Sequence, residues 1–428
     1  MKKNVFLLMW IFFCFQFKAQ SLYFPPNNSE VWDTLSPDSM HYCPDKIQEL
    51  YTYLDNTHSK AFILLKDGKI VLEKYFYSFT KDSLHVWNSA GKTLTALAIG
   101  IAHEEGYLSI YDKTSQYLGQ GWTSLSIEQE EKIKIWHQLT MTSGLNHIGD
   151  HYCTLPECLV YEAEPGTRWM YHNAPYTLLD SVIYFATGTN LNQYVNAKIL
   201  SKIGMNGLFF PIGYNNIFIS KPRSMARYGL LLLNRGLWNT TYVANHDFID
   251  SMTTKSQDLN KAYGFLTWLN GNGSYMLPSP DVQYTVNENP LPNAPMDLYA
   301  AMGKDGQILN IVPSQNLILV RMGDNDGNSL VSTQYNDTIW QYVNELQCNL
   351  STSKINLNHQ SIYYDEHNQK LIFKNSEYDE LYLCSVLGEK YPINTIDFQI
   401  STEKLNSGLY FLTYKENQQL KTFRFVKK

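Results

Sequence analysis

Residues 21–348 contain strand-like apolar runs at both ends and helix-like periodicity between them. Near the start, Ala61–Leu65 and Ile70–Tyr75 are apolar runs joined by an Asp-Gly turn, which is typical of a β-hairpin. Near the end, four further runs have the length and composition of strands: Tyr263–Leu269, Tyr299–Met302, Gln307–Val312 and Leu317–Met322.

Four stretches in the middle have the apolar period of a helix, and a glycine follows each of them. Asn173-Ala-Pro175 opens one with a capping residue and a first-turn proline. The expected helices are Ser89–Glu105, 173–187, Leu191–Ile203 and Ser224–Leu233. Strands at both ends with helices between them predict an α/β fold of the α+β kind, in which an antiparallel sheet is flanked by helices and carries an inserted all-helical lobe.

The composition changes at residues 349–358, which form a polar, linker-like stretch. Beyond it, short alternating runs lie close together between turn residues: Ser361–Tyr364, Lys370–Phe373, Glu380–Cys384, Leu409–Tyr414 and Lys421–Val426. Residues 359–428 are therefore expected to form a small β-sandwich, separate from the domain at 21–348.

Residues 1–20 have the layout of a secretory signal peptide. Lys2 and Lys3 precede an apolar block, Val5–Phe17, which is too short to span a membrane. Two alternatives are weaker: a buried N-terminal strand would begin a domain with many exposed aromatic residues, and a lipoprotein signal at Cys14 would need a small residue where Phe13 stands. We expect cleavage near Gln20 and export of the chain.

Composition narrows the possible partners. With 34 basic and 40 acidic residues the net charge is −6, and the arginines are scattered. A phosphate-binding groove needs a clustered basic face, so nucleic-acid binding is not expected. No apolar run reaches the roughly 18 residues of a spanning helix, so no stable membrane span is expected.

The cysteines are interpreted in the light of export. Cys153 and Cys158 flank a turn-like Thr-Leu-Pro-Glu segment, and in an oxidising compartment a local disulfide is expected. No Cys-x-x-Cys pair is present, and Gly149 separates His147 from His151 without an acidic ligand nearby, so neither a metal site nor another cofactor is predicted.

The first candidate for chemistry is Ser89-Ala-Gly-Lys92 at the start of a long apolar helix. At this spacing the amine can reach the hydroxyl, and burial at the positive end of a helix favours a neutral lysine that can accept the serine proton. The spacing itself is common, since Ser78–Lys81, Ser351–Lys354 and Ser401–Lys404 share it. Only Ser89 opens a long helix.

A second candidate is Tyr171-His-Asn173, just before the proline-marked helix start. Its phenol can relay a proton and its amide can hold a carbonyl group. The same spacing recurs at Tyr194–Asn196, Tyr214–Asn216 and Tyr342–Asn344. Of these, Tyr214 is the strongest rival because it lies in an expected loop.

The third candidate is Gly303-Lys304-Asp305-Gly306-Gln307, between two expected strands. Glycines there let a backbone approach a ligand and leave N–H groups free for an oxyanion hole. A plain hairpin turn explains the segment equally well when it is taken alone.

These motifs, in this order and with Leu139-Thr-Met-Thr-Ser-Gly-Leu145 between the first two, resemble the serine beta-lactamase-related hydrolases. That family includes class C beta-lactamases, penicillin-binding DD-peptidases, esterases and 6-aminohexanoate-dimer hydrolases. The resemblance implies Ser89 as an acylated nucleophile, Lys92 as its proton partner and Tyr171 as the acid/base for the leaving group. It also implies substrate binding through Asn173 and the Gly303–Gln307 turn, with the Ser89 and Lys304 N–H groups forming the oxyanion hole.

One departure concerns the substrate. The family's third motif usually offers Lys or His two places before its first glycine, where this chain has Ala301. The resemblance therefore favours a small-molecule or peptide ester or amide as substrate. A beta-lactamase or DD-peptidase activity, and an inactive relative that only binds cell-wall material, are the alternatives.

The end of the chain carries a second resemblance. Residues 400–412 and 421–428 resemble the C-terminal sorting domain of type IX secretion in Bacteroidetes. This implies that the secretion machinery is a partner, with passage through the periplasm to the cell surface or the medium.

Overall fold

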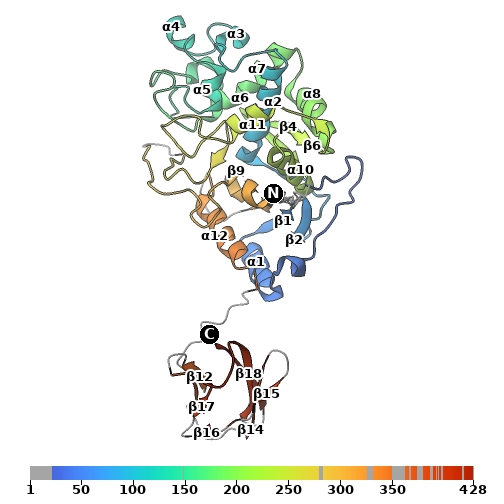
Figure 1. Cartoon of the computed structure of the whole chain (residues 1–428). Coiled ribbons are helices and arrows are strands. Elements are labelled where there is room, and N and C mark those ends of the chain that lie inside the picture. Colours follow the sequence, from blue (N-terminus) through green and yellow to red (C-terminus); the bar gives the residue numbers. More distant parts are fainter. Residues whose placement is uncertain are drawn as a thin grey trace, which may run out of the picture. The chain divides into compact units, whose positions relative to one another are not determined.

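The structure is a computed structural model of the whole chain. It describes residues 22–147, 149–278, 283–324, 331–348, 362–365, 368–373, 379–385, 389–391, 393, 395–396, 399–416 and 419–427. The chain divides into two compact units at residue 347, and each is described by itself (Figure 1).

A six-stranded antiparallel sheet in the order β2-β1-β11-β10-β9-β8 forms the centre of the first unit. The strands are β1 (Ser59–Lys66), β2 (Lys69–Tyr75), β8 (Trp268–Leu269), β9 (Tyr299–Gly303), β10 (Gln307–Val312) and β11 (Leu317–Gly323). β1 from the beginning of the unit pairs with β11 from its end, so the segment between β2 and β8 is inserted into the sheet. The predicted α+β fold class is confirmed.

Helices cover both faces of this sheet. The helix α10 (Pro222–Leu233) packs so closely that a Cβ on Gly229 would meet Leu309 of β10 and Ile318 of β11. The next residue of β10, Asn310, exchanges hydrogen bonds with Asn336 of α12 (Thr333–Asn344). Because successive strand residues point to opposite faces, α10 and α12 lie on opposite sides. The helix α1 (Pro44–Asn56) packs against α12.

The inserted segment is organised around α2 (Lys92–Glu104), whose residues from Lys92 to Ala102 are all buried. It packs against α7 (Leu179–Thr187) and α11 (His246–Met252) (Figure 1). Shorter helices complete the segment: α3 (Ser115–Leu118), α4 (Ile127–Glu130), α5 (Ile135–Leu139), α6 (Asn173–Thr177), α8 (Leu191–Val195) and α9 (Ser201–Ile203). Each expected helix is present, although the one expected at 173–187 is split into α6 and α7, and α8 continues through a π-helical turn into α9.

Two stretches differ from the pattern-based expectation. Only Trp268–Leu269 of the expected strand at 263–269 is a strand. The preceding backbone turns sharply, with Leu266 at a φ of 51° and Gly264 packed against Met252 O. The sheet of β3 (His85–Val86), β5 (Asn215–Ser220) and β4 (Leu208–Ile212), which accompanies the inserted helices, was not anticipated.

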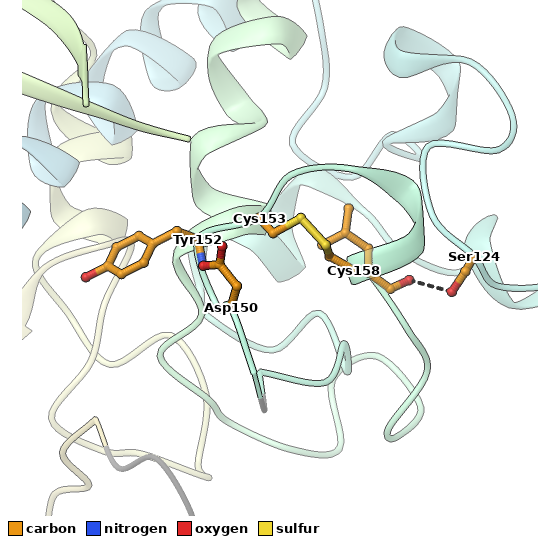
Figure 2. The surroundings of a disulfide bond; sticks show 6 residues. Ser124, Asp150, Tyr152, Cys153 and Cys158 are labelled. Carbon is orange, nitrogen blue, oxygen red and sulfur yellow. Dashed lines mark hydrogen bonds between the residues drawn. A yellow bond between two sulfur atoms is a disulfide. The ribbon is translucent and has the colours of Figure 1, made fainter. Parts of the chain in front are cut away.

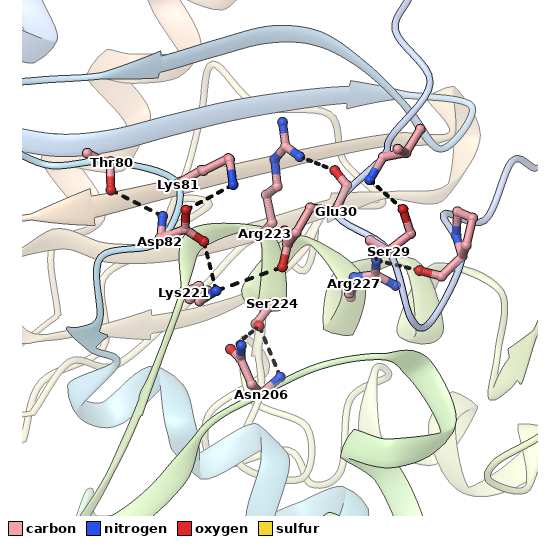
Figure 3. A network of polar contacts seen from close by, with 12 residues as sticks. Ser29, Glu30, Thr80, Lys81, Asp82, Asn206, Lys221, Arg223, Ser224 and Arg227 are labelled. Carbon is pink, nitrogen blue, oxygen red and sulfur yellow. Dashed lines mark hydrogen bonds and ion pairs between the residues drawn. The ribbon is translucent and has the colours of Figure 1, made fainter.

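Polar contacts attach the segment before β1 to α10. The buried guanidinium of Arg227 donates hydrogen bonds to the carbonyls of Pro25, Pro26 and Ser29. Arg223 makes a bidentate ion pair with Glu73 of β2, at 2.7 Å for both contacts. It also donates a hydrogen bond to Glu30 O (Figure 3). These bonds fix the first turn of α10 against β2 and the chain's early segment.

The second unit is a sandwich of two four-stranded sheets, β12-β13-β17-β16 and β15-β14-β18-β19. Its strands are β12 (Ile362–Asp365), β13 (Lys370–Phe373), β14 (Asp379–Ser385), β15 (Lys390–Tyr391), β16 (Thr395–Ile396), β17 (Gln399–Ser401), β18 (Gly408–Glu416) and β19 (Gln419–Lys427). Its core joins Leu371 and Ile400 of one sheet to Leu383, Leu412 and Phe425 of the other. No helix among the described residues has the length and apolar character needed to cross a bilayer; residues 1–20 of the signal prediction lie outside them.

Candidate active site

Ser89 lies in a 3₁₀ turn, Asn88–Gly91, that leads directly into α2. The preceding residue, Trp87, anchors the turn to β5, because Trp87 N donates to Phe218 O at 2.8 Å and the Trp87 indole donates to Ser220 Oγ at 2.8 Å. Asn88 has a φ of 48°, in the left-handed region. This sharp entry places the partly exposed Ser89 at the N-terminal end of a buried helix.

Lys92 points back to Ser89, with its Nζ donating to Ser89 Oγ at 3.0 Å. The side chain is only 3% exposed, and burial lowers its pKa to about 7. Its Nζ lies 4.3 Å from the ring centre of Tyr176 and 5.2 Å from that of Tyr171. These rings stabilise a cation without fixing it as strongly as a carboxylate would. The amine can therefore change its protonation near neutral pH.

Tyr171 is buried beside the same serine. Burial raises the pKa of its phenol well above the ordinary value, while the hydrogen-bonding interaction with Ser89 acts in the opposite direction. The phenol therefore carries its proton at neutral pH. Two places on, the buried Asn173 opens α6, and its Oδ1 has no hydrogen-bond partner among the described residues. An unsatisfied buried acceptor is costly, so this amide is suited to a ligand N–H group.

The Gly303–Gln307 turn packs directly against the Asn88–Gly91 turn that carries Ser89. A Cβ on Gly303 would lie 2.9 Å from Ser89 N and 2.4 Å from Trp87 O, so only glycine fits. The Asn88 amide donates to Lys304 O at 2.9 Å and ties the two turns together. The side chain of Lys304 itself is exposed.

Gly306 and Gln307 have structural partners. Both ends of the Gln307 amide bond to the backbone of Gly323, at 2.6 Å and 3.2 Å. A Cβ on Gly306 would lie 2.7 Å from the guanidinium of Arg321. Both residues thus shape the turn, and the contact with substrate that the family resemblance implied stays a prediction.

Arg321 was not anticipated from the sequence. It is fully buried in β11, and it donates to the carbonyls of Asp305 and Gly306, at 2.7 Å and 3.0 Å. Further bonds reach Thr57 O at 2.8 Å and Ser59 Oγ at 3.0 Å. Because its guanidinium bonds to these backbone carbonyls, Arg321 holds the backbone of the Gly303–Gln307 turn in place. Its only sequence signal is a charge in an otherwise apolar strand.

A cavity of about 320 Å³ opens in front of Ser89 and Lys92. Tyr152 and Tyr176 contribute aromatic surface, and Ile212 and Ile217 contribute aliphatic surface. The remaining lining is polar and comes from Asn88, Asn215, Asn216, Lys304 and Asp305. The cavity is of the size and mixed character of a small-molecule site. Ala301 is a buried residue of β9, so no cation occupies the place two residues before Gly303.

Tyr152 in the cavity wall directly precedes Cys153, which forms a disulfide with Cys158 whose sulfur atoms are 2.02 Å apart. Tyr152 adjoins this bridge, and its side chain extends away from it (Figure 2). Beyond the bridge, Ser124 Oγ donates to Leu159 O at 3.1 Å. The chain leaving the bridge is therefore attached to the stretch between α3 and α4.

The other Ser–Lys and Tyr–Asn pairs with the same spacing make different contacts where the structure describes them. Lys81 forms an ion pair with Asp82, Tyr194 donates to Glu105, and Tyr342 stacks on Tyr53. Tyr214 is 40% exposed, although its neighbour Asn216 lines the cavity. The Ser351–Lys354 pair lies outside the described residues.

Among the described residues, one surface cluster brings possible metal ligands close together. His246, Asp247 and Asp250 bring ligand atoms within 4.8 Å of one another. His246 Nδ1 lies 2.9 Å from Asp247 Oδ1, and Asp250 forms an ion pair with Arg235. None of these residues lines the cavity at Ser89.

Known proteins with similar sequences point to one family. Residues 52–329 match the family described as Beta-lactamase. "Putative penicillin-binding protein PbpX" of Bacillus subtilis is 29% identical over 179 residues, or 38% of this chain and 44% of that protein. The chain thus spans less than half the length of the curated relatives that it matches.

Solved structures agree on the fold. "Putative 6-aminohexanoate-dimer hydrolase from Bacillus anthracis" has a TM-score of 0.58 and 18% identity, covering 77% of this chain and 92% of that one. A family VIII carboxylesterase has a TM-score of 0.53 and 14% identity, covering 71% of this chain and 98% of its own. At such identities the similarity concerns the fold alone. The family match extends over more than half of the sequence, and the chain therefore belongs to the beta-lactamase family.

Proposed function

We propose that this protein is a serine hydrolase that cleaves an ester or amide bond through an acyl-enzyme at Ser89. The observation that carries the proposal is the 3.0 Å contact between Ser89 Oγ and the buried Lys92 Nζ. Because burial lowers the pKa of Lys92 to about 7, a large fraction of the amine is neutral at physiological pH and can accept the serine proton.

In the proposed reaction, Ser89 Oγ attacks the carbonyl carbon and its proton passes to Lys92 Nζ. The N–H groups of Ser89 and Lys304 stabilise the oxyanion of the tetrahedral intermediate. Tyr171 gives its proton to the leaving group as the carbon–heteroatom bond breaks. The Lys92 ammonium then returns a proton to the phenolate, and a water molecule hydrolyses the acyl-enzyme by the reverse sequence.

Neutral or weakly charged substrates fit this site best. With Ala301 in place of a cation, the charged side chains among the described residues that line the cavity are Lys92, Lys304 and Asp305, and the last two carry opposite charges. Asn173 offers an acceptor for a substrate amide. A beta-lactamase or DD-peptidase activity is the second candidate, because a penicillin-binding protein is among the curated relatives.

Intact-mass measurement after exposure to a serine-reactive fluorophosphonate, and separately to a penicillin, distinguishes these possibilities. A fluorophosphonate adduct that Ser89→Ala abolishes supports the hydrolase. A penicillin adduct in addition favours the second candidate. Absence of both adducts would leave the inactive, cell-wall-binding relative as the better description.

We also propose that the protein is exported and sorted to the surface or the medium. The N-terminal basic-apolar pattern and the resemblance of the last residues to type IX sorting domains support this, and the Cys153–Cys158 disulfide suits an oxidising compartment. Deleting residues 358–428 is expected to retain the protein in the periplasm, as measured by fractionation and immunoblotting. Unchanged appearance in the medium would refute the sorting role.

A further inference from the structure

A carboxyl group contacts the wall of the Ser89 cavity from behind. Asp180, in the first turn of α7, accepts a hydrogen bond of 2.7 Å from the side-chain nitrogen of Asn216, and Asn216 lines the cavity. The other carboxyl oxygen of Asp180, Oδ1, is buried and has no hydrogen-bond partner among the described residues. The proposed reaction does not use this acid, although a single side chain separates it from the cavity.

The surroundings of Asp180 are unfavourable for a carboxylate. Burial raises the pKa of Asp180 to about 7, and the hydrogen bond from Asn216 acts in the opposite direction. Burial and then the charge of Asp180 raise the pKa of the Tyr176 phenol, so Asp180 lies within electrostatic range of a second residue of the cavity wall. A buried acid whose hydrogen-bond partner lines a cavity is a candidate for a role in that site.

The contact with Asp180 fixes which end of the Asn216 amide faces the cavity. A side-chain amide has a nitrogen that donates hydrogen bonds and an oxygen that accepts them. Because the nitrogen of Asn216 donates to the carboxyl group, its oxygen is turned away from Asp180. Within the described part of the chain, no donor bonds to Asn216 Oδ1. The wall therefore presents a hydrogen-bond acceptor to the cavity.

The strand β5 fixes the position of this acceptor relative to the nucleophile. Two residues of β5 accept the hydrogen bonds that anchor Trp87, next to the turn that carries Ser89, and Asn216 stands near the start of the same strand. Tyr171, the proposed proton donor to the leaving group, is not among the described residues that line this cavity. The cavity is therefore suited to the acyl part of the substrate.

We infer that Asn216 is a specificity-determining residue that selects substrates with an N–H group in the acyl part, and that Asp180 is the positioning residue that turns the Asn216 oxygen toward them. The inference rests on the proposed function and names a substrate class for it. The N–H group belongs to a secondary amide or to another neutral donor. A site built to accept a hydrogen bond discriminates against an analogue that has no proton to donate.

Pairs of p-nitrophenyl esters that differ in one group test the inference. One member carries an acetylamino group on its acyl chain, and the other carries an acetoxy group, in which oxygen replaces the N–H. Two pairs are used, with one or two methylene groups between this substituent and the scissile carbonyl. The leaving group is constant, and each ester is compared with itself across variants, so differences in intrinsic reactivity cancel. The release of p-nitrophenolate gives kcat/KM.

For Asn216→Ala we expect about a tenfold loss of kcat/KM with the acetylamino ester of at least one pair, and less than a twofold loss with its acetoxy partner. Asp180→Ala should produce at least a threefold selective loss, and the double variant should equal Asn216→Ala, because both residues act through one contact. Asp337→Ala is the matched control, since Asp337 accepts from the side-chain nitrogen of Asn293 at the same 2.7 Å but does not line the cavity. It should change neither rate.

Equal effects of Asn216→Ala on the two members of both pairs would overturn the inference, because a folding defect does not distinguish an N–H group from an oxygen. A selective loss in Asn216→Ala that Asp180→Ala lacks would refute the positioning role of the acid. If Asp180→Ala does not fold, the isosteric Asp180→Asn takes its place, with at least a twofold selective loss expected because its amide can meet either end of the Asn216 amide. If the unmodified protein shows no Ser89-dependent hydrolysis of the four esters, the proposed function itself has failed; Ser89-dependent hydrolysis without any selective loss refutes only this inference.

Discussion

Replacing Gly303 by alanine adds a single methyl group at the point where the Gly303–Gln307 turn contacts the Asn88–Gly91 turn that carries Ser89. The backbone of Gly303 has φ −132° and ψ 162°, an extended conformation that alanine adopts without strain. The effect of the substitution is therefore steric. The new Cβ would lie 2.4 Å from Trp87 O and 2.9 Å from the N atoms of both Ser89 and Ala90, where real Cβ contacts are essentially never below 3.0 Å.

All three contacts are with backbone, so no flexible side chain can move aside, and the two turns must separate by several tenths of an ångström. That separation changes the spacing of the Ser89 and Lys304 N–H groups, which form the proposed oxyanion hole. Loss of one such donor costs about 10² to 10³ in kcat. We predict a loss of roughly 100-fold in kcat on an ester substrate and a comparable slowing of fluorophosphonate labelling.

The assay compares steady-state rates and thermal unfolding for Gly303→Ala and for Gly408→Ala. A methyl group on Gly408 would find only ordinary contacts, the nearest being 3.7 Å away. The control should therefore retain full activity. A Gly303→Ala variant with kcat within twofold of the unmodified protein would contradict this prediction, because it would mean that the close approach of the two turns does not position the catalytic groups.

Four further predictions concern the same site. Lys92→Met should reduce kcat/KM about 10³-fold, and in the unmodified protein kcat/KM should fall as the pH drops through about 7, because the amine must be neutral. Burial lowers the pKa of Lys92 from 10.5, so the unfolded chain binds more protons than the folded protein between about pH 7 and 10.5. The free energy of unfolding of the unmodified protein should therefore rise with pH in that window. Urea titrations of Lys92→Met should lack this rise. Tyr171→Phe should lower kcat 10²- to 10⁴-fold, and an unchanged rate would exclude it as the proton donor. Arg321→Met leaves several backbone carbonyls without their donor, so it should cost about 3 kcal/mol or more in urea unfolding, and a loss below about 1 kcal/mol would contradict the proposed role of this arginine.

The sequence predicted the elements whose signals are local. Gly106, Gly188 and Gly204 correctly marked helix ends, because a left-handed or terminal glycine is a property of a few neighbouring residues. The motif at Ser89 and Lys92 was equally accessible, since both side chains lie within one helical turn.

What could not be predicted depends on contacts between distant segments. The partners of Arg321 in residues 57–59 and 305–306 come together only when β1 pairs with β11. The same is true of Gln307, whose side-chain amide bonds to the backbone of Gly323, while its substrate-binding role stays a prediction. The strand expected from Tyr263 failed for a related reason, because Gly264 is packed against Met252 and the backbone must turn there.

The disulfide of Cys153 and Cys158 could be predicted from the sequence, but its position in the fold could not. The spacing of Cys153 and Cys158 was enough to suggest a local bridge. Its position beside the cavity, with Tyr152 in the wall, depends on the contact of His151 with α6 and was not visible in the pattern.

The proposed activation of Ser89 by Lys92 can be tested by intact mass spectrometry of the full-length protein after treatment with a fluorophosphonate, with peptide mapping of the modified residue. We expect one phosphonyl adduct per chain, located on Ser89, absent from Ser89→Ala and formed at a rate that falls as the pH drops through about 7. No adduct on the unmodified protein, or an adduct that persists in Ser89→Ala, would contradict it.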